Sequence, residues 1–235
     1  GLSRVRTFSL LGALLLVSAC ATSGPVTSEA PAPNALRLLV VRHGEAYSNV
    51  PHPADMPWEQ LDSLTTKGIT QATAAGAFLK KHPVVAVFVS PTGRTRQTGT
   101  IIAQQIGLPG VTAEEAAFAG MKEGKTPEGQ AASWSWRLAQ WKAGRDARPV
   151  GGESLEDAAT RAIRAVERLA AQHSGKAVVV VTHSDVSAAL IGHAAGTPMV
   201  QRPDKHTVPT ASVSEIIVSS DGVWKLAKQG ELPGS

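Results

Sequence analysis

The stretch LRLLVVRHG, residues 36–44, decides the fold of this chain. Five of its first six residues are apolar, and the run ends on Arg42, His43 and Gly44. A nearly continuous apolar run of this length is typical of a strand that is buried on both faces of a parallel sheet. We therefore expect a buried strand over residues 36–42, followed directly by His43 at its carboxyl end.

The rest of the chain alternates short apolar runs with amphipathic or alanine-rich stretches. Residues 84–89 and 177–182 have the composition of two further buried strands. Helical patterns and N-cap residues predict helices over residues 65–81, 95–106, 128–142, 154–172 and 186–195. Residues 212–218 and 223–228 flank a Ser-Ser-Asp-Gly turn and predict a β-hairpin. The alternation predicts a three-layer α/β/α fold, with a mostly parallel central sheet and helices on both faces.

The first residues have the layout of a secretory signal. Arg4 and Arg6 precede an apolar run over residues 8–17, and small residues follow it. The run is shorter than the roughly 20 residues that a membrane-spanning helix needs. The Val-Ser-Ala-Cys sequence that ends at Cys20 resembles a bacterial lipobox, which implies that the Cys20 thiol receives a diacylglyceryl group. Ordinary signal cleavage after Ala21 is the alternative.

These features divide the chain into three parts. We expect a lipoprotein signal peptide over residues 1–19, the lipid-attachment Cys20 with a flexible tether over residues 20–35, and a folded domain over residues 36–235. The tether is rich in Ser, Thr, Pro and Ala. The expected location is extracytoplasmic, anchored by lipid to a bacterial membrane. In a Gram-negative source this would be the outer membrane, facing the periplasm.

The composition excludes several classes of protein. Of the 235 residues, 43% are hydrophobic and 18% are charged, which is ordinary for a globular domain. The formal charge is +4, but Arg4 and Arg6 lie in the predicted signal peptide, so the rest of the chain has 21 basic and 19 acidic residues. A net charge of about +2 gives no basic surface stripe, and we expect no nucleic-acid partner. A single cysteine provides neither a disulfide framework nor a cysteine-based zinc site.

Two histidines and two arginines follow the predicted buried strands. Arg42 and His43 follow the first, Arg94 lies shortly after the second, and His183 follows the third. The carboxyl ends of parallel strands meet at one edge of a sheet, where ligands bind. Arginine forks suit phosphate or carboxylate oxygens, and a histidine can act as base or nucleophile. No third ligand has zinc-site spacing, and Arg42 would repel a cation, so we expect no metal and no other cofactor.

Five segments resemble the signature of the histidine phosphatase superfamily, which has the phosphoglycerate mutase-like fold. They are Arg-His-Gly-Glu at 42–45 with Asn49, the helix start at 64–72, Ser-Pro-x-x-Arg-x-x-Gln-like residues 90–98, Gly-Gly-Glu-Ser at 151–154 with Asp157 and Arg161, and Val-Val-Thr-His at 180–183. They run through most of the predicted domain in the order of the family.

The resemblance implies a role for each residue of the cluster. His43 is the nucleophile that accepts the phosphoryl group, while Arg42, Arg94 and His183 hold the phosphoryl oxygens. Such positioning and charge stabilisation account for most of the catalysis of phosphoryl transfer.

Two further residues are predicted to contact the substrate. Asn49 follows the first histidine and is a candidate phosphate ligand, although an asparagine that caps a loop fits equally well. Ser184 stands where the family commonly has glycine after the second histidine, which narrows the pocket. Trp134, Trp136 and Trp141 either cover the substrate or pack against the domain.

The general acid is expected in the segment that resembles the family pattern Glu-x-x-Phe-Gly. Glu115 stands three residues before Phe118, as the pattern requires, but Ala119 is an extra residue before the glycine. Glu114 is the alternative within this segment. Asp185 is a weaker candidate: a related branch has an acidic residue directly after the second histidine, whereas Ser184 intervenes in this chain.

The resemblance implies a metal-independent phosphomonoester phosphatase that acts on a small phosphorylated substrate through a phosphohistidine on His43. The first alternative is a phosphoglycerate mutase-like phosphotransferase, which export disfavours because phosphoglycerates are cytoplasmic. The second is a catalytically vestigial, lipid-anchored envelope binding protein. That alternative predicts the loss of His43, Arg94 or His183, and all three are present.

Overall fold

The computed structural model describes residues 31–234, so the predicted signal peptide, Cys20 and most of the predicted tether lie outside the described residues. The described part contains a six-stranded sheet with the order β3-β2-β4-β1-β5-β6. The strands are β1 (Leu36–Arg42), β2 (Val84–Val89), β3 (Ala113–Glu114), β4 (Ala177–Thr182), β5 (Val213–Val218) and β6 (Trp224–Glu231). The pairs β1–β4, β2–β4 and β2–β3 are parallel, whereas β5 is antiparallel to both β1 and β6.

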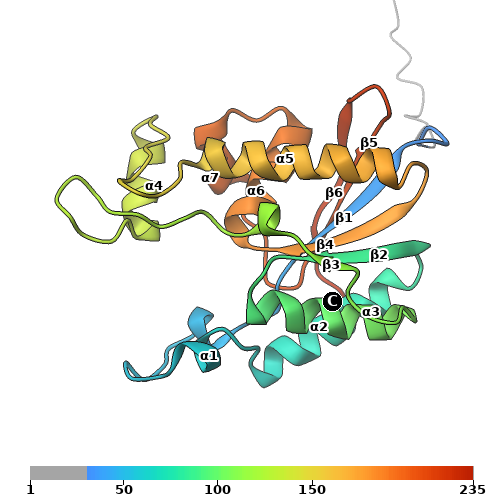
Figure 1. Cartoon of the computed structure of the whole chain (residues 1–235), viewed down its shortest axis with the longest axis horizontal. Coiled ribbons are helices and arrows are strands. Elements are labelled where there is room, and N and C mark those ends of the chain that lie inside the picture. The colour runs from blue at the N-terminus through green and yellow to red at the C-terminus, as the bar shows by residue number, and fades with distance from the viewer. Residues whose placement is uncertain (1–30, 235) are drawn as a thin grey trace, which may run out of the picture. The chain divides into compact units, whose positions relative to one another are not determined.

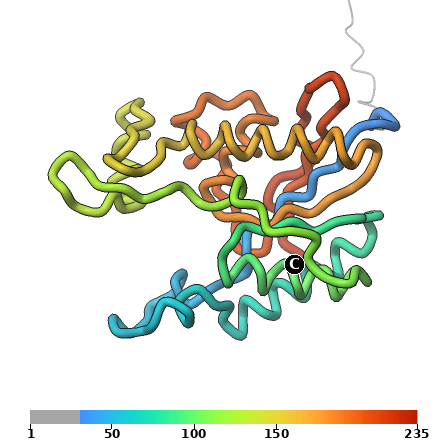
Figure 2. Tube along the Cα trace, in the orientation of Figure 1, coloured from blue at the N-terminus to red at the C-terminus, as the bar shows by residue number. Residues whose placement is uncertain are grey.

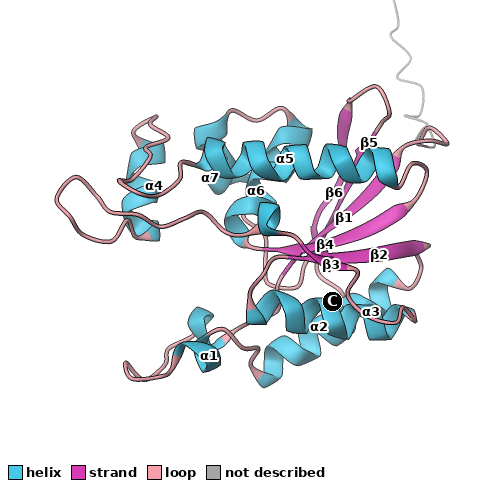
Figure 3. Ribbon diagram, in the orientation of Figure 1, coloured by secondary structure: helices cyan, strands magenta, loops and turns pink. Residues whose placement is uncertain are grey.

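Helices cover both faces of this sheet, which confirms the predicted three-layer α/β/α architecture. They are α1 (Trp58–Leu61), α2 (Thr66–Leu79), α3 (Gly93–Ile106), α4 (Trp134–Lys142), α5 (Leu155–Gln172), α6 (Ser184–Ala195) and α7 (Arg202–His206). Figure 1 and Figure 3 show α2 and α3 on one side of the sheet and α5 on the other. Short 3-10 helices lie at Tyr47–Asn49, Ala116–Phe118 and Met199–Gln201.

The sequence of β1 fits this layered position. Leu38 and Val40 pack in one apolar cluster with residues of α5 and α6, while Leu39 and Val41 pack in a second cluster with residues of α2 and α3. Because successive side chains point to opposite faces, a strand covered on both sides has to be apolar at nearly every position. The two clusters hold the carboxyl end of β1 firmly between the layers.

The backbone just after His43 passes very close to the start of α2. A Cβ atom on Gly68 would lie 2.0 Å from the carbonyl oxygen of Glu45, and one on Gly44 would lie 2.7 Å from the carbonyl oxygen of Gly68. Thr65 caps α2, since its side chain accepts a hydrogen bond from the Gly68 N–H. The two glycines therefore allow the loop after His43 to pack directly on this helix.

Several predicted boundaries were wrong. The helix predicted over 128–142 begins only at Trp134, because Gly129 has a φ of +82° in a turn and Ser133 caps the helix. Helices α3 and α6 each begin two residues earlier than expected. Strand β3 and the short helices α1 and α7 were not predicted.

Two long connections leave the sheet on the same side. The segment between β1 and α2, which includes α1, and the segment between β3 and α5, which includes α4, both extend beyond the sheet in Figure 2. The first connection starts directly after His43. No helix within residues 31–234 has the length and apolar character that crossing a membrane requires.

Candidate active site

His43 lies at the carboxyl end of β1, and its residue is only 4% exposed. Its backbone N–H donates to the Thr182 carbonyl over 3.0 Å, which ties it to the end of β4. Its Nδ1 lies 2.8 Å from the Gly44 carbonyl oxygen. Because a carbonyl oxygen only accepts, we assign the proton to Nδ1. The lone pair therefore lies on Nε2.

Arg94 joins the two histidines. Its Nε donates to Nε2 of His43 and its Nη2 donates to Nδ1 of His183, each over 3.3 Å. Its Nη1 donates to Oδ1 of Asp62 over 2.5 Å, and Asp62 also accepts the Gly93 N–H over 2.7 Å. The carboxylate of Asp62 therefore fixes the guanidinium against both imidazole rings, whose centroids are 5.5 Å apart.

The side chain of His183 is oriented by a hydroxyl behind it. Its Nε2 lies 2.7 Å from Oγ of Ser90, a residue at the end of β2. Since Nδ1 of His183 accepts from Arg94, its Nε2 carries the proton and donates to Ser90. His183 is also the residue that precedes the first turn of α6. The N-terminus of a helix favours an anion, so the positions of both ring and helix suit phosphate binding.

Arg42 has donors that the protein does not satisfy. Its Nη1 donates to the Val208 carbonyl over 2.7 Å, but its buried Nε has no hydrogen-bond partner in the described structure. Burial lowers the pKa of Arg42, and the charge of Asp185 acts in the opposite direction. A buried donor without a partner is unfavourable by about 1–3 kcal/mol. An anion bound beside Arg42 would remove this penalty.

Both histidines of the site are neutral at neutral pH. Burial, followed by the neighbouring His183, lowers the pKa of His43 to about 3. Burial, followed by the charge of Arg94, lowers the pKa of His183 to about 3. The positive charge of the cluster therefore comes from its two arginines. A neutral His43 keeps its Nε2 lone pair, which a nucleophile requires.

The structure does not bring Glu115 to this cluster. Its carboxylate forms an ion pair over 3.0 Å with Arg168 of α5, and Glu114 pairs with the exposed Arg96. The extra Ala119, which displaces the sequence by one residue relative to the family pattern, fits this departure. A catalytic role for Glu115 stays a prediction.

Asp185, by contrast, lies beside His183. A Cβ atom on Gly120 would be 3.5 Å from Oδ2 of Asp185 and 3.6 Å from Cγ of His183. Oδ2 accepts the Met121 N–H over 2.6 Å, and Oδ1 accepts the Val186 N–H over 2.8 Å. The signal in the sequence was an acidic residue two positions after the second histidine.

The Gly-Gly-Glu-Ser segment supports the loop that contacts Asp185. Arg161 of α5 pairs with Glu153 over 2.9 Å and donates to the carbonyl oxygens of Ala117 and Gly120 over 2.7 and 3.0 Å. Glu153 also accepts the Lys122 N–H over 3.0 Å. These residues hold the backbone on either side of Met121, so their role here is to position the loop.

Asn49 and Ser184 are the remaining residues that were predicted to contact the substrate. Asn49 accepts the Ala46 N–H over 2.9 Å, which is the loop-capping contact, and its phosphate contact stays a prediction. Ser184 begins α6 and lines a hollow together with Arg42.

Sequence reasoning missed Asp62, which lies in a polar loop, and the Val208 carbonyl, a backbone group that no side-chain pattern reveals.

Comparison with known proteins identifies the class. Residues 38–231 match the model of the histidine phosphatase superfamily, branch 1. The chain belongs to this superfamily, as its motifs predicted. One relative is a 2,3-bisphosphoglycerate-dependent phosphoglycerate mutase of Methylobacterium radiotolerans, 28% identical over 177 residues that cover 71% of this chain and 82% of the relative.

Two further likenesses are to phosphatases. A metal-independent phosphoserine phosphatase of Arabidopsis thaliana is 33% identical over 167 residues, which cover 65% of this chain and 66% of the relative. The structure of a mycobacterial glucosyl-3-phosphoglycerate phosphatase is similar with a TM-score of 0.66 and 25% identity, covering 83% of this chain and 99% of the other. The superfamily thus includes both mutases and phosphatases among the relatives of this chain.

Proposed function

We propose that this protein is a phosphomonoesterase that works through a phosphohistidine on His43. The observation that carries the proposal is the contact of Arg94 with Nε2 of His43 and Nδ1 of His183. It marks a position where phosphoryl oxygens would meet a fixed guanidinium beside a neutral imidazole lone pair. Arg42 supplies a second guanidinium with an unused donor.

The proposed reaction has two steps. Nε2 of His43 attacks phosphorus, and a P–N bond forms while the P–O bond to the alcohol breaks. A protonated carboxylic acid gives its proton to the leaving alcohol oxygen, and the resulting carboxylate then takes a proton from water. That water attacks phosphorus, the P–N bond breaks, and orthophosphate leaves. The arginines stabilise the negative charge of both transition states.

Two carboxyl groups are candidates for this proton transfer. Glu115 is implied by the family pattern, whereas Asp185 lies beside His183. Position in the fold favours Asp185, because the contacts of Glu115 run to Arg168 on α5.

The test is phosphate release from p-nitrophenyl phosphate in the presence of EDTA. We expect turnover by the purified protein and its loss in His43→Ala, while His82→Ala, a half-buried histidine outside the site, stays active. Rapid quenching should trap an alkali-stable, acid-labile phosphohistidine. A requirement for added metal, or activity in His43→Ala, would overturn the mechanism.

A mutase is the second candidate, because one of the relatives is named as a phosphoglycerate mutase. It would use the same phosphohistidine but return the phosphoryl group to a bound phosphoglycerate. Isotope exchange between phosphoglycerate isomers, measured against orthophosphate release, separates the two activities. The site residues needed for either are present, which argues against a vestigial binding protein.

We further propose that the enzyme is exported and lipid-anchored through Cys20. The support is the basic, apolar and small-residue order of residues 1–20, with the chain's single cysteine at the last position. Two or more acyl chains provide stable anchoring to a membrane. Expression in a bacterium with labelled palmitate should label the wild-type protein and not Cys20→Ser. Label in neither protein would contradict lipidation.

A further inference from the structure

A groove lies between α4 and α7. Its lining includes Arg42, Ser184, Trp134, Leu138 and Pro203, and its volume is ≈ 460 Å³. A second hollow of ≈ 370 Å³ shares Leu138, Pro203 and Asp204 with it and is also lined by Lys142 and Lys205. We call the first of these the α4–α7 groove. The charge of Arg42 acts on both His43 and His183, so this arginine connects the groove with the phosphoryl site.

The outer wall of the groove is apolar and braced. Trp134 is 42% exposed, and its ring packs edge-on against Trp141 with centroids 5.3 Å apart. Trp141 is buried and donates its indole N–H to Asp146 over 3.0 Å. An indole held in this way presents a large apolar surface with little further loss of rotamer freedom.

The charges around the groove are unfavourable for a second anion. Of the described residues that line it, Arg42 alone is positively charged, and its charge acts on His43 and His183. Asp204 adds a carboxylate to the lining, and it is exposed. A second phosphate or carboxylate held within the α4–α7 groove would therefore lie beside Asp204, because Lys142 and Lys205 line the second hollow and not this one.

We infer that the α4–α7 groove binds the alcohol part of the substrate, and that this part is aromatic or otherwise apolar and carries no second anionic group. The inference rests on the proposed phosphatase function and names the substrate class of the same site. An aromatic ring between Trp134 and Pro203 would lose its water-exposed surface while the phosphoryl group is held by Arg42 and Arg94. Small polar esters leave most of this groove empty.

The first test compares esters whose leaving alcohols have similar intrinsic reactivity. We expect kcat/KM for 2-phenylethyl phosphate to exceed that for glycerol 1-phosphate by about tenfold or more, since burying the ring adds apolar contact. 3-Phosphoglycerate, which carries a carboxylate, should be the poorest of the three. Equal values, or a preference for 3-phosphoglycerate, would overturn the inference.

The second test removes the apolar wall. Trp134→Ala should raise KM for 2-phenylethyl phosphate about tenfold and change KM for glycerol 1-phosphate by less than about twofold. The matched control is Trp136→Ala, because Trp136 lies on the same helix but lines a different hollow. If Trp134→Ala does not fold, Trp134→Phe should retain the preference for the aromatic ester. An equal loss on both esters would show a structural role and overturn the inference.

A binding measurement separates this inference from the proposed function. If the wild-type protein hydrolyses none of the three esters, the phosphatase proposal fails. Calorimetry with His43→Ala still tests the groove. 2-Phenylethyl phosphate should bind more tightly than inorganic phosphate, and the added Trp134→Ala change should abolish the difference. Equal affinities for the two ligands would overturn the assignment of the groove.

Discussion

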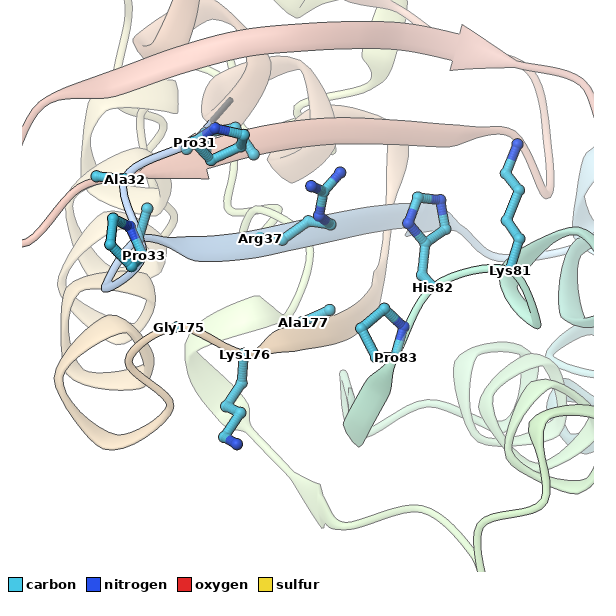
Figure 4. A pocket seen from close by; sticks show the side chains of 12 residues that line it. Pro31, Ala32, Pro33, Arg37, Lys81, His82, Pro83, Gly175, Lys176 and Ala177 are labelled. Carbon is cyan, nitrogen blue, oxygen red and sulfur yellow. The ribbon is translucent and has the colours of Figure 1, made fainter. Parts of the chain in front are cut away.

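Strand β1 carries an arginine near each end. Arg37, near the amino end, lines a hollow together with His82, whereas Arg42, at the carboxyl end, is followed by His43. The hollow at the amino end has a volume of ≈ 380 Å³, and Figure 4 shows Arg37, Lys81 and His82 lining it. Arg37 forms an ion pair with Glu215 of β5. His82 is half-buried. Here the basic groups have either a partner or access to solvent.

At the carboxyl end the same residue types are buried and incompletely satisfied. His43 is buried with its Nε2 facing Arg94, and the Nε of Arg42 has no partner. Asp62 accepts from Nη1 of Arg94, while the Nε and Nη2 of this guanidinium are directed at the two histidines. The reactive end is therefore distinguished by the burial and orientation of its basic groups, because arginine and histidine occur at both ends of the strand.

Removing one arginine near each end of β1 should have very different effects on activity. Arg94→Met should lower kcat/KM for p-nitrophenyl phosphate by about a thousandfold or more, because transition-state charge loses a fixed guanidinium. Arg37→Met should leave kcat/KM within about twofold. Steady-state kinetics on both variants measures this, with circular dichroism to confirm folding. Similar losses of kcat/KM in the two variants would contradict the assignment of the reactive site to the carboxyl end of β1.

The identity of the proton donor sharpens the description of the carboxyl end. Asp185→Asn should lower kcat for an alkyl phosphate by about 10²–10⁴, whereas p-nitrophenyl phosphate, with its good leaving group, should be affected less. Glu115→Gln should change kcat by less than about threefold, because its contacts run to Arg168. The reverse result would show that the catalytic complex brings Glu115 to the site.

Acid should destabilise the protein through the buried histidines. An unfolded histidine has a pKa near 6.5, whereas the pKa values of His43 and His183 are about 3 in the folded protein. Between these values the unfolded chain binds more protons, so the free energy of unfolding falls as pH is lowered from 6.5. Each histidine lowers the free energy of unfolding by up to about 1.4 kcal/mol for every pH unit below 6.5.

Urea unfolding between pH 7 and pH 5 measures this slope. His43→Gln should flatten it, because one buried group no longer titrates. His82→Gln should change it less, since burial lowers the pKa of His82 at a more exposed position. An unchanged slope in His43→Gln would show that His43 is protonated in the folded protein.

The smallest effect is expected at the amino end. Glu215→Gln keeps the shape of the side chain but removes the charge that pairs with Arg37, so it should lower the free energy of unfolding by about 1 kcal/mol. Phosphate release should not change. Chemical denaturation and steady-state kinetics together check both statements, and a loss of activity here would mean that the two ends are coupled.

Much of the fold could be read from local pattern. The apolar runs of β1, β2 and β4 and the capped starts of α2 and α5 were predicted, because apolar periodicity and N-caps act over a few residues. The start of α4 and the existence of α7 were not, because both depend on turns and contacts with distant segments. His206, for example, is buried in α7 between Thr197 and Gln229.

The sequence alone determined the class of fold, the family, and the convergence of His43, Arg94 and His183 at one sheet edge. Only the tertiary structure decided how these side chains engage one another. Asp62 orients Arg94, the Val208 carbonyl takes one donor of Arg42, and Glu115 pairs with α5. The physical reason is that apolar patterning specifies which face of an element is buried. The partner of a charged side chain, in contrast, depends on which distant groups the packed elements bring within hydrogen-bond distance.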